Sequence, residues 1–296
     1  MTGWNLSVIS AGTEYPLSDN RDYVLTGLDG IAGAPVERIT EQGPMQHGVS
    51  DRGYRLRPRK LVLALSVRCG DAADWFARRH ELLRMFRPGR EPVRLRLTSG
   101  PVVRQIDCHL DGTLEMTPDV NWGTRWQRVG IELYAPDPTW YDPAGRTAAF
   151  SLGGGGLLAI PLAVPMAVGS STIDQSLQIK YEGTWDAAPI ITLRGPMTDP
   201  VITNQTLGDK LDFTSTSISA GVSYVIDCRY GYKTVTRTSD GANRIQDLTH
   251  DSDLATFRIG AHPDVRDGYN SIRVSASGLT VASVVYLQYY TRYIGV

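Results

Sequence analysis

The order of apolar and polar positions divides the chain into a first half of mixed structure and a second half of short strands. In the first half, short apolar pieces are bounded by glycine and proline, which is typical of strands and tight turns. These pieces predict strands at Trp4–Ile9, Tyr23–Leu25, Lys60–Val67, Val93–Leu97, Val102–Leu110 and Arg128–Tyr134. Lys60–Val67 is apolar at nearly every position, so we expect it to be buried on both faces. Asn121–Trp126 predicts the tip of a hairpin.

One stretch, residues 71–87, predicts a helix. Asp71 is a suitable N-cap, and Asp74 places a negative charge near the positive end of the helix dipole. Pro88 and Gly89 end the pattern. The apolar residues that recur at helical spacing are Trp75, Phe76, Leu82, Leu83 and Phe86. We expect this stripe to lie across a sheet as part of a core.

The second half predicts closely spaced strands and no helix. Gly, Asp and Asn separate the apolar pieces, a pattern that indicates a β-sandwich of jelly-roll or galectin-like type. The predicted strands are Leu177–Tyr181, Ile190–Leu193, Val201–Asn204, Lys210–Phe213, Tyr224–Cys228, Lys233–Arg237, Ala255–Ile259, Asn270–Val274 and Val284–Arg292.

A length of 296 residues predicts two domains. Tyr134–Pro143 contains three prolines and reads as a stiff, extended strap at the end of the first domain. The run Gly153–Gly156 indicates a flexible linker. The expected organisation is mainly β. An N-terminal β-sandwich-like domain with one helix and a long arm (1–148) is followed by a Gly-rich linker (149–170) and a C-terminal sandwich (171–296).

Residues 40–59 predict the arm. This segment holds three glycines and two prolines and almost no aliphatic residues, so it does not resemble a core element. A long segment of this kind in a compact domain often contacts a partner. The alternative interpretation is a surface loop without a role.

Composition and charge exclude several classes of protein. The net charge is −1, and no apolar run approaches the length of a membrane helix, so we expect no membrane insertion. The N-terminus lacks the pattern of a signal peptide, and the three cysteines are far apart, which favours synthesis in a reducing compartment. Residues 38–104 hold 15 Lys and Arg against 6 Asp and Glu. Such a basic sector suits side-to-side assembly of identical subunits, but also a solvated surface or a nucleic-acid face.

The sequence offers no catalytic, metal or cofactor site. Cys108 and His109 would point to opposite faces of a strand, so they form a poor nucleophile–base pair. His250, Asp251 and Asp253 lack the remaining spacing of a calcium loop. We therefore predict that the protein is not an enzyme. Aromatic residues of the second half can stack on sugars, although tyrosines more often fill the core of a sandwich. The candidate glycan contacts are Trp185, Tyr230, Tyr232 and Tyr289.

The order of these features resembles the distal tail protein (Dit) family of long-tailed, siphovirus-type bacteriophages, over nearly the whole chain. In the first half the resemblance rests on Gly43-Pro-Met-Gln-His-Gly48, Arg57-Pro-Arg-Lys60, Asp74-Trp75, Phe86-Arg-Pro88 and Ala135-Pro-Asp-Pro-Thr-Trp-Tyr-Asp142. In the second half it rests on Tyr181-Glu-Gly-Thr184, Ala188-Pro-Ile-Ile-Thr-Leu-Arg-Gly-Pro196, Pro200-Val-Ile-Thr-Asn204, Tyr224-Val-Ile-Asp227 and Gly268-Tyr-Asn-Ser-Ile272.

The resemblance implies a structural protein of the virion, made in the host cytoplasm. Six copies would form a ring at the tail tip, between the tail tube protein above and the tip, baseplate hub and receptor-binding proteins below, with DNA passing through unread. The arm would hold a neighbouring subunit. We expect the arm and the basic sector to place these residues in the subunit interface: Met45, His47, Arg52, Tyr54, Arg55, Arg57 and Arg59. The alternative function is a carbohydrate-binding adhesion module that contacts a host surface glycan through the C-terminal sandwich.

Overall fold

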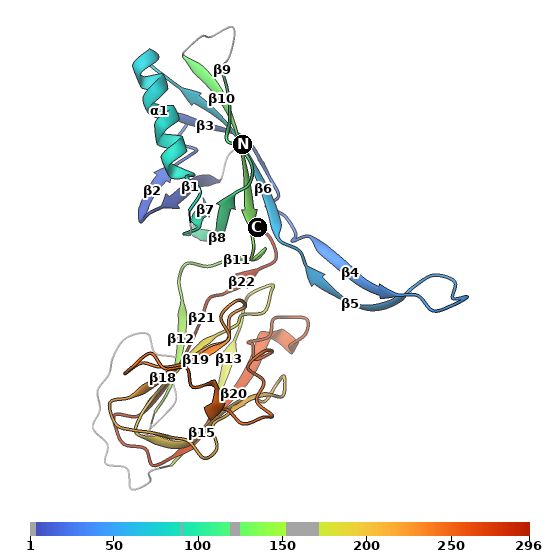
Figure 1. Cartoon of the computed structure of the whole chain (residues 1–296), viewed down its shortest axis with the longest axis vertical. Helices are drawn as coiled ribbons and strands as arrows, with labels where there is room; N and C mark the ends of the chain where they lie inside the picture. The colour runs from blue at the N-terminus through green and yellow to red at the C-terminus, as the bar shows by residue number, and fades with distance from the viewer. Residues whose placement is uncertain (1–3, 90, 119–124, 152–171) are drawn as a thin grey trace. The chain divides into compact units, whose positions relative to one another are not determined.

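The computed structural model describes residues 4–89, 91–118, 125–151 and 172–296 (Figure 1). The chain forms two compact units. The first contains Met1–Pro143 and, in addition, Tyr293–Val296, and the second contains Ala144–Arg292. The described residues form several antiparallel sheets and one α-helix, which confirms the prediction of a mainly β protein.

One continuous sheet of ten strands forms the body of the first unit. Along its main path the order is β2 (Thr13–Pro16), β1 (Asn5–Ser10), β7 (Val93–Ser99), β8 (Val102–Leu110), β10 (Trp126–Ala135), β6 (Arg59–Arg68) and β3 (Tyr23–Asp29). The remaining strands lie off this path: β9 (Glu115–Pro118) pairs with β10, and β11 (Trp140–Tyr141) pairs with β8 and with β22 (Arg292–Tyr293). A separate hairpin consists of β4 (Val36–Glu41) and β5 (Ser50–Leu56).

The longest pairing of this unit joins β6 and β10, whose inward residues build the core. Leu61, Leu63 and Leu65 of β6 are buried, and each lies opposite a buried residue of β10. The outward positions of β6 are different, because Lys60 and Ala64 are exposed. The expectation that this strand is buried on both faces was therefore wrong. Its outward apolar residues are small or half-buried. A continuous run of apolar residues in the sequence does not show whether one face of the strand or both faces are buried.

Helix α1 (Ala72–Met85) begins where the sequence predicts. The Asp71 side chain accepts a hydrogen bond from the backbone N–H of Asp74, at 2.8 Å, and so caps the first turn. Leu82 and Met85 are buried against the sheet, whereas Phe76 and Leu83 are 57% and 51% exposed. An α-helix turns by roughly 100° per residue, so these two residues lie well to one side of Leu82. The prediction that Phe76 and Leu83 belong to the core-facing stripe of the helix was therefore wrong.

The second unit is a β-sandwich. One sheet has the order β12 (Arg146–Ser151), β21 (Val284–Tyr289), β14 (Ile190–Arg194), β18 (Ser223–Asp227) and β19 (Thr234–Arg237). The other has β13 (Ile173–Lys180), β20 (Tyr269–Ser277), β15 (Met197–Asn204) and β16 (Asp209–Asp212), with β17 (Ser217–Ile218) on β15. Two 3₁₀ turns, η1 (Ile245–Asp247) and η2 (Arg266–Gly268), lie in the connections.

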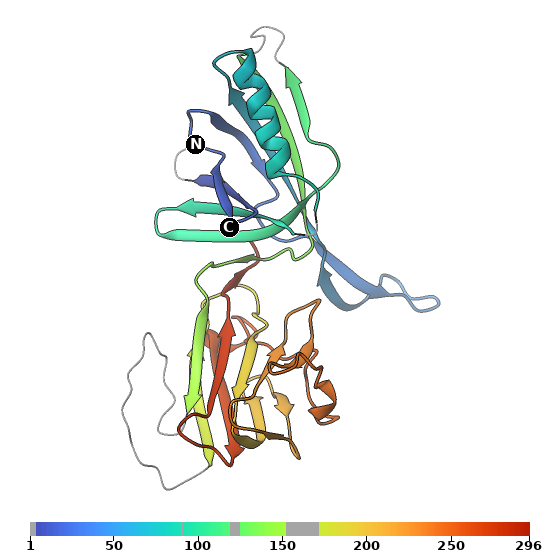
Figure 2. The ribbon, with the colours of Figure 1, turned by 60° about the vertical axis from the view of Figure 1, so that its left-hand side comes forward.

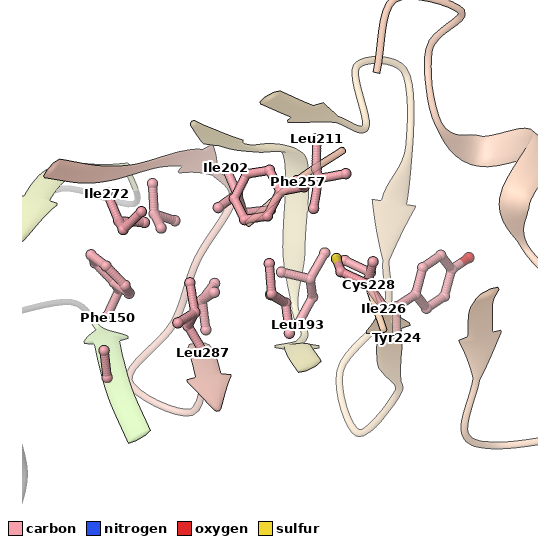
Figure 3. Packing of buried hydrophobic residues seen from close by; sticks show 14 of the residues in the cluster. Phe150, Leu193, Ile202, Leu211, Tyr224, Ile226, Cys228, Phe257, Ile272 and Leu287 are labelled. Atoms are coloured by element: carbon pink, nitrogen blue, oxygen red, sulfur yellow. The ribbon is translucent and has the colours of Figure 1, made fainter. Parts of the chain in front are cut away.

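Side chains of both sheets fill the core between them. Figure 3 shows Ile202 and Ile272 of one sheet facing Leu193 and Leu287 of the other. All of the strands predicted in the second half overlap strands of the structure except Ala255–Ile259. That segment is irregular, and only an isolated bridge joins Ile259 to Ala187. The jelly-roll or galectin-like topology stays a prediction.

The boundary between the units differs from the predicted one. Strand β12 belongs to the second unit, so the first part of the predicted linker 149–170 is strand, and the rest from residue 152 lies outside the described residues. Ala148, Ala149 and Phe150 of β12 are buried, and small residues before a glycine run give a weak strand signal. The predicted last strand, Val284–Arg292, is two strands, β21 and β22. The predicted hairpin tip at Asn121–Trp126 falls largely outside the described residues.

Candidate assembly site

The β4–β5 hairpin stands apart from both hydrophobic cores. In the described part of the chain, β4 and β5 pair only with each other. Figures 1 and 2 show the hairpin projecting from the rest of the first unit, and no residue from Val36 to Arg57 is buried. A single two-stranded hairpin is at best marginally stable in water. The predicted arm is thus a hairpin that begins at Val36 and not at residue 40, and it lacks a core of its own.

One face of the hairpin carries Val36, Tyr54 and Leu56 together with Arg38, which pairs with Asp51 at 3.0 Å. In the register of the two strands, Val36 lies opposite Leu56 and Arg38 lies opposite Tyr54. Successive residues of a strand point to opposite sides, so these four side chains share one face. Val36 and Tyr54 are 52% and 50% exposed, and the Arg38 guanidinium lies 5.7 Å from the centre of the Tyr54 ring. We call this surface the apolar face.

The opposite face carries ion pairs. Glu37 accepts a hydrogen bond from Arg57 Nη2 at 2.6 Å and another from Arg55 Nε. These two bonds, from Arg57 and then Arg55, lower the pKa of Glu37 to about 2. Arg52 pairs with Glu41 at 2.7 Å. The predicted interface residues Arg52, Arg55 and Arg57 therefore hold the hairpin together along what we call the charged face.

The tip of the hairpin is an ordered turn that presents Met45. The backbone N–H of Gly43 donates to Gln46 Oε1 at 2.9 Å, and Gln46 Nε2 donates to Ser50 Oγ at 2.9 Å. Met45 has a φ of +61° and is 99% exposed, and His47 is also exposed. The sequence analysis named Met45 and His47 but missed Gln46, whose amide organises the turn. It also missed Val36, the first residue of the hairpin.

Arg59 was assigned to the subunit interface, and this assignment was wrong. Its side chain is buried, with 1% exposure. Its guanidinium donates to four backbone carbonyl oxygens at 2.5 to 2.7 Å, those of Gly30, Ala32, Pro138 and Ile294. Burial lowers the pKa of Arg59 below its usual value. The residue joins distant segments of the first unit and presents nothing to a neighbouring molecule.

The four predicted glycan contacts fall into different environments. Tyr289 is buried, with its ring centre 5.9 Å from that of Tyr181, so its assignment was wrong. Trp185 is half-buried, and its backbone N–H donates to the carbonyl of Arg292. Tyr230 and Tyr232 are 81% and 60% exposed and lie together in the turn after β18.

The described residues contain no group of three or more His, Cys, Asp or Glu side chains placed to hold a metal ion. Cys69, Cys108 and Cys228 are buried, and burial raises the pKa of all three thiols, that of Cys228 to about 12. The one helix of the described chain is too short and too polar to span a membrane.

Comparison with known proteins gives one family match and several structural matches. Residues 10–135 match the phage tail protein RIFT-related domain. The crystal structure of Dit from phage SPP1 superposes with a TM-score of 0.64 at 13% sequence identity, covering 97% of this chain and 98% of that one. A chain of the phage P2 baseplate in its activated conformation reaches a TM-score of only 0.49 at 8% identity, over 96% and 97% of the two chains. No curated protein matches the sequence.

The family match and the fold agree on the first unit. The matched residues run from the end of β1 to the end of β10, and they include the hairpin and the helix. The SPP1 Dit comparison extends the likeness of fold through the second unit. Residues 10–135 therefore match the phage tail protein RIFT-related domain, and the chain shares the fold of SPP1 Dit over nearly its whole length.

Proposed function

We propose that this protein is a structural hub of a phage tail tip, in which six copies form a ring through contacts of the hairpin. The SPP1 Dit protein, which shares the fold, is described as a paradigm of hub adsorption apparatus in phages that infect Gram-positive bacteria. In the proposed assembly, the ring joins the tail tube protein above to the tip, baseplate hub and receptor-binding proteins below. The protein acts in the virion, after synthesis in the host cytoplasm, and has no enzymatic role.

The projecting hairpin is the observation that carries the ring. Val36 and Tyr54 expose about half of their surfaces on the apolar face, which lies outside both hydrophobic cores of the described chain. Covering this face with a second copy would remove apolar surface from water and stabilise the hairpin at the same time. The same hairpin is repeated on every copy, and a contact from one copy to the next closes into a ring when the rotation between them allows it.

The native mass of the full chain tests this proposal. We expect a species close to six times the 32.5 kDa of one chain. A variant in which Asn-Gly replaces Glu37–Arg55 tests the role of the hairpin. Val36 and Leu56 are directly opposite each other, so a two-residue turn closes the gap. This variant should keep the β-rich circular dichroism spectrum of the parent and run as a monomer. A hexamer that survives the deletion would contradict the role of the hairpin.

DNA passage through the ring is part of the same proposal. The net charge of −1 gives no general attraction to nucleic acid, which suits a channel that DNA crosses without being held. The first unit would line the channel. We therefore expect weak binding to double-stranded DNA that is the same for unrelated sequences in an electrophoretic mobility assay. Binding that depends on the base sequence would contradict passive passage.

A further inference from the structure

The turn that follows β18 presents two tyrosines to solvent without an evident role in folding. Tyr230 is 81% exposed and Tyr232 is 60% exposed, and they are separated only by Gly231. Neighbouring β-strands of this unit bury their large apolar side chains between the two sheets. Two exposed aromatic rings in one turn therefore suggest a contact with something outside the chain.

The turn holds both rings in place. The Arg229 guanidinium pairs with Asp227 at 2.6 Å and lies 4.5 Å from the centre of the Tyr232 ring. Lys233 Nζ lies 4.8 Å from the centre of the Tyr230 ring and donates to the carbonyl of Cys228 at 2.5 Å. Lys233 itself has a φ of +46°, an unusual value for a residue with a side chain. Each ring therefore has a cation over it, which restricts its motion.

A hollow adjoins this turn. Its volume is about 380 Å³, within the range of about 300 to 1,000 Å³ that is common for small-ligand sites. Its lining combines aliphatic side chains with two hydroxyls and one ammonium group, from Lys233, Ile245, Leu248, Thr249, Ser252, Leu254 and Ala255. Lys233 lines the hollow and also lies beside the Tyr230 ring, so this one side chain joins the hollow to the turn that carries the two tyrosines.

We propose that this surface, formed by Tyr230, Tyr232 and the hollow, is a carbohydrate-binding site. Sugar rings expose C–H faces, which pack on aromatic rings, and N-acetyl methyl groups, which fit an aliphatic hollow. Their hydroxyl and carbonyl oxygens can accept from the Lys233 ammonium, which has three hydrogens and donates one to Cys228. The site is independent of the hub role proposed above.

The charges around the surface favour a neutral or N-acetylated oligosaccharide over a polyanion. Asp227 neutralises Arg229, which leaves Lys233 as the cation that lines the hollow. Asp247 and Asp251 lie within residues 245–255, the segment that supplies most of the hollow wall. A nucleic acid or a phosphate-rich polymer would need several cations in a row. A protein partner would need about 800 Å² of surface, far more than two tyrosines and Ile245 provide.

Binding of the full-length chain to a printed array of neutral, N-acetylated and acidic oligosaccharides tests the site. We expect binding to neutral or N-acetylated members, followed by titration of the strongest one by calorimetry. Tyr230→Ala and Tyr232→Ala should each weaken the affinity at least tenfold, because each removes a stacking face. Tyr269→Ala is the matched control, since Tyr269 is 49% exposed in the same unit and does not line the hollow, and its affinity should equal that of the parent.

Three outcomes would overturn the proposal. The first is an array with no bound oligosaccharide. The second is an affinity that the Tyr230→Ala, Tyr232→Ala double variant leaves unchanged. The third is binding confined to acidic members and lost between 0.05 and 0.5 M salt, which would indicate attraction to a polyanion. Neither tyrosine belongs to the hairpin, so the double variant should keep the native mass of the parent, and a failure here leaves the hub proposal intact.

Discussion

At the scale of single residues, Arg59 has the clearest structural role in the first unit. A buried guanidinium is costly unless its N–H groups are satisfied. Here four carbonyl oxygens accept from it, and they come from positions 30, 32, 138 and 294, which are far apart in the sequence. A glycine is needed at position 30, where the backbone lies close to that of Lys60. Gly30 has a φ of +80°, and an added Cβ would lie 2.2 Å from the Lys60 carbonyl oxygen.

Arg59→Met should destabilise the first unit strongly. The substitution keeps an apolar stem of similar length but removes the hydrogen bonds that Arg59 donates to four carbonyl groups, so we expect a loss of about 3 kcal/mol or more. Arg57→Met is the control, because Arg57 is exposed and its ion pair with Glu37 acts on the hairpin, outside the hydrophobic core of the unit, so its loss should change the stability of the whole unit little. Urea unfolding followed by tryptophan fluorescence measures both, because five of the six tryptophans belong to the first unit. Equal midpoints for the two variants would refute this role.

At the scale of elements, the charged face makes the hairpin sensitive to acid. Arg57 and Arg55 hold the pKa of Glu37 at about 2, below its ordinary value of 4.5. A depressed pKa means that the ion pairs stabilise the hairpin above pH 4.5, and that this contribution is lost as the pH falls toward 2. Amide exchange in β4 and β5, corrected for intrinsic rates, should therefore accelerate relative to β6 between about pH 4.5 and about pH 2.5. Glu37→Gln should remove most of this pH dependence, and an unchanged profile would contradict the assignment.

The two faces of the hairpin should also differ in assembly. Tyr54 on the apolar face and Ile39 on the charged face are similarly exposed, at 50% and 47%. Tyr54→Asp should reduce the native mass from that of a hexamer to that of a monomer, because a carboxylate would be buried against the neighbouring copy. Ile39→Asp, on the other face, should leave the hexamer in place. Loss of assembly in both variants, or in neither, would refute the assignment of the apolar face as the contact surface.

The sequence predicted elements better than it predicted the environments of single side chains. The helix was found because its cap and its stop are local signals, Asp71 and Pro88. The arm was found from composition, but its start at Val36 was missed. Tyr289 and Tyr290 show why burial of a single side chain could not be predicted from the sequence. They are adjacent, so a strand turns them to opposite sides, and only the pairing partners decide that Tyr289 is buried while Tyr290 is 42% exposed. Arg59 could not be recognised, because its acceptors are brought together only by the fold.

At the scale of the whole molecule, the first unit is discontinuous in sequence. The chain leaves it after Pro143 and returns with Tyr293–Val296. Besides the pairing of β22 with β11, side-chain and backbone contacts within the unit hold this returning segment. Arg59 Nη2 donates to the Ile294 carbonyl at 2.6 Å, the Val296 N–H donates to the Ile31 carbonyl at 3.1 Å, and the Arg104 guanidinium lies 3.6 Å from the centre of the Tyr293 ring. The last four residues are therefore part of the packing of the first unit.

A fragment that ends at Pro143 should consequently be less stable than the first unit with its returning segment. We expect a chain of residues 1–143 to unfold at a lower urea concentration than the same chain joined through a glycine–serine linker to Tyr293–Val296. In the shorter fragment one N–H of Arg59 loses its acceptor and the Ile31 carbonyl loses its donor, and each unsatisfied group costs about 1 to 3 kcal/mol where it stays buried. A linker that ends in four glycines is the matched control and should not restore stability. If the short fragment and the fusion unfold at the same midpoint, the returning segment contributes nothing to the unit, and the boundary belongs at Pro143 alone.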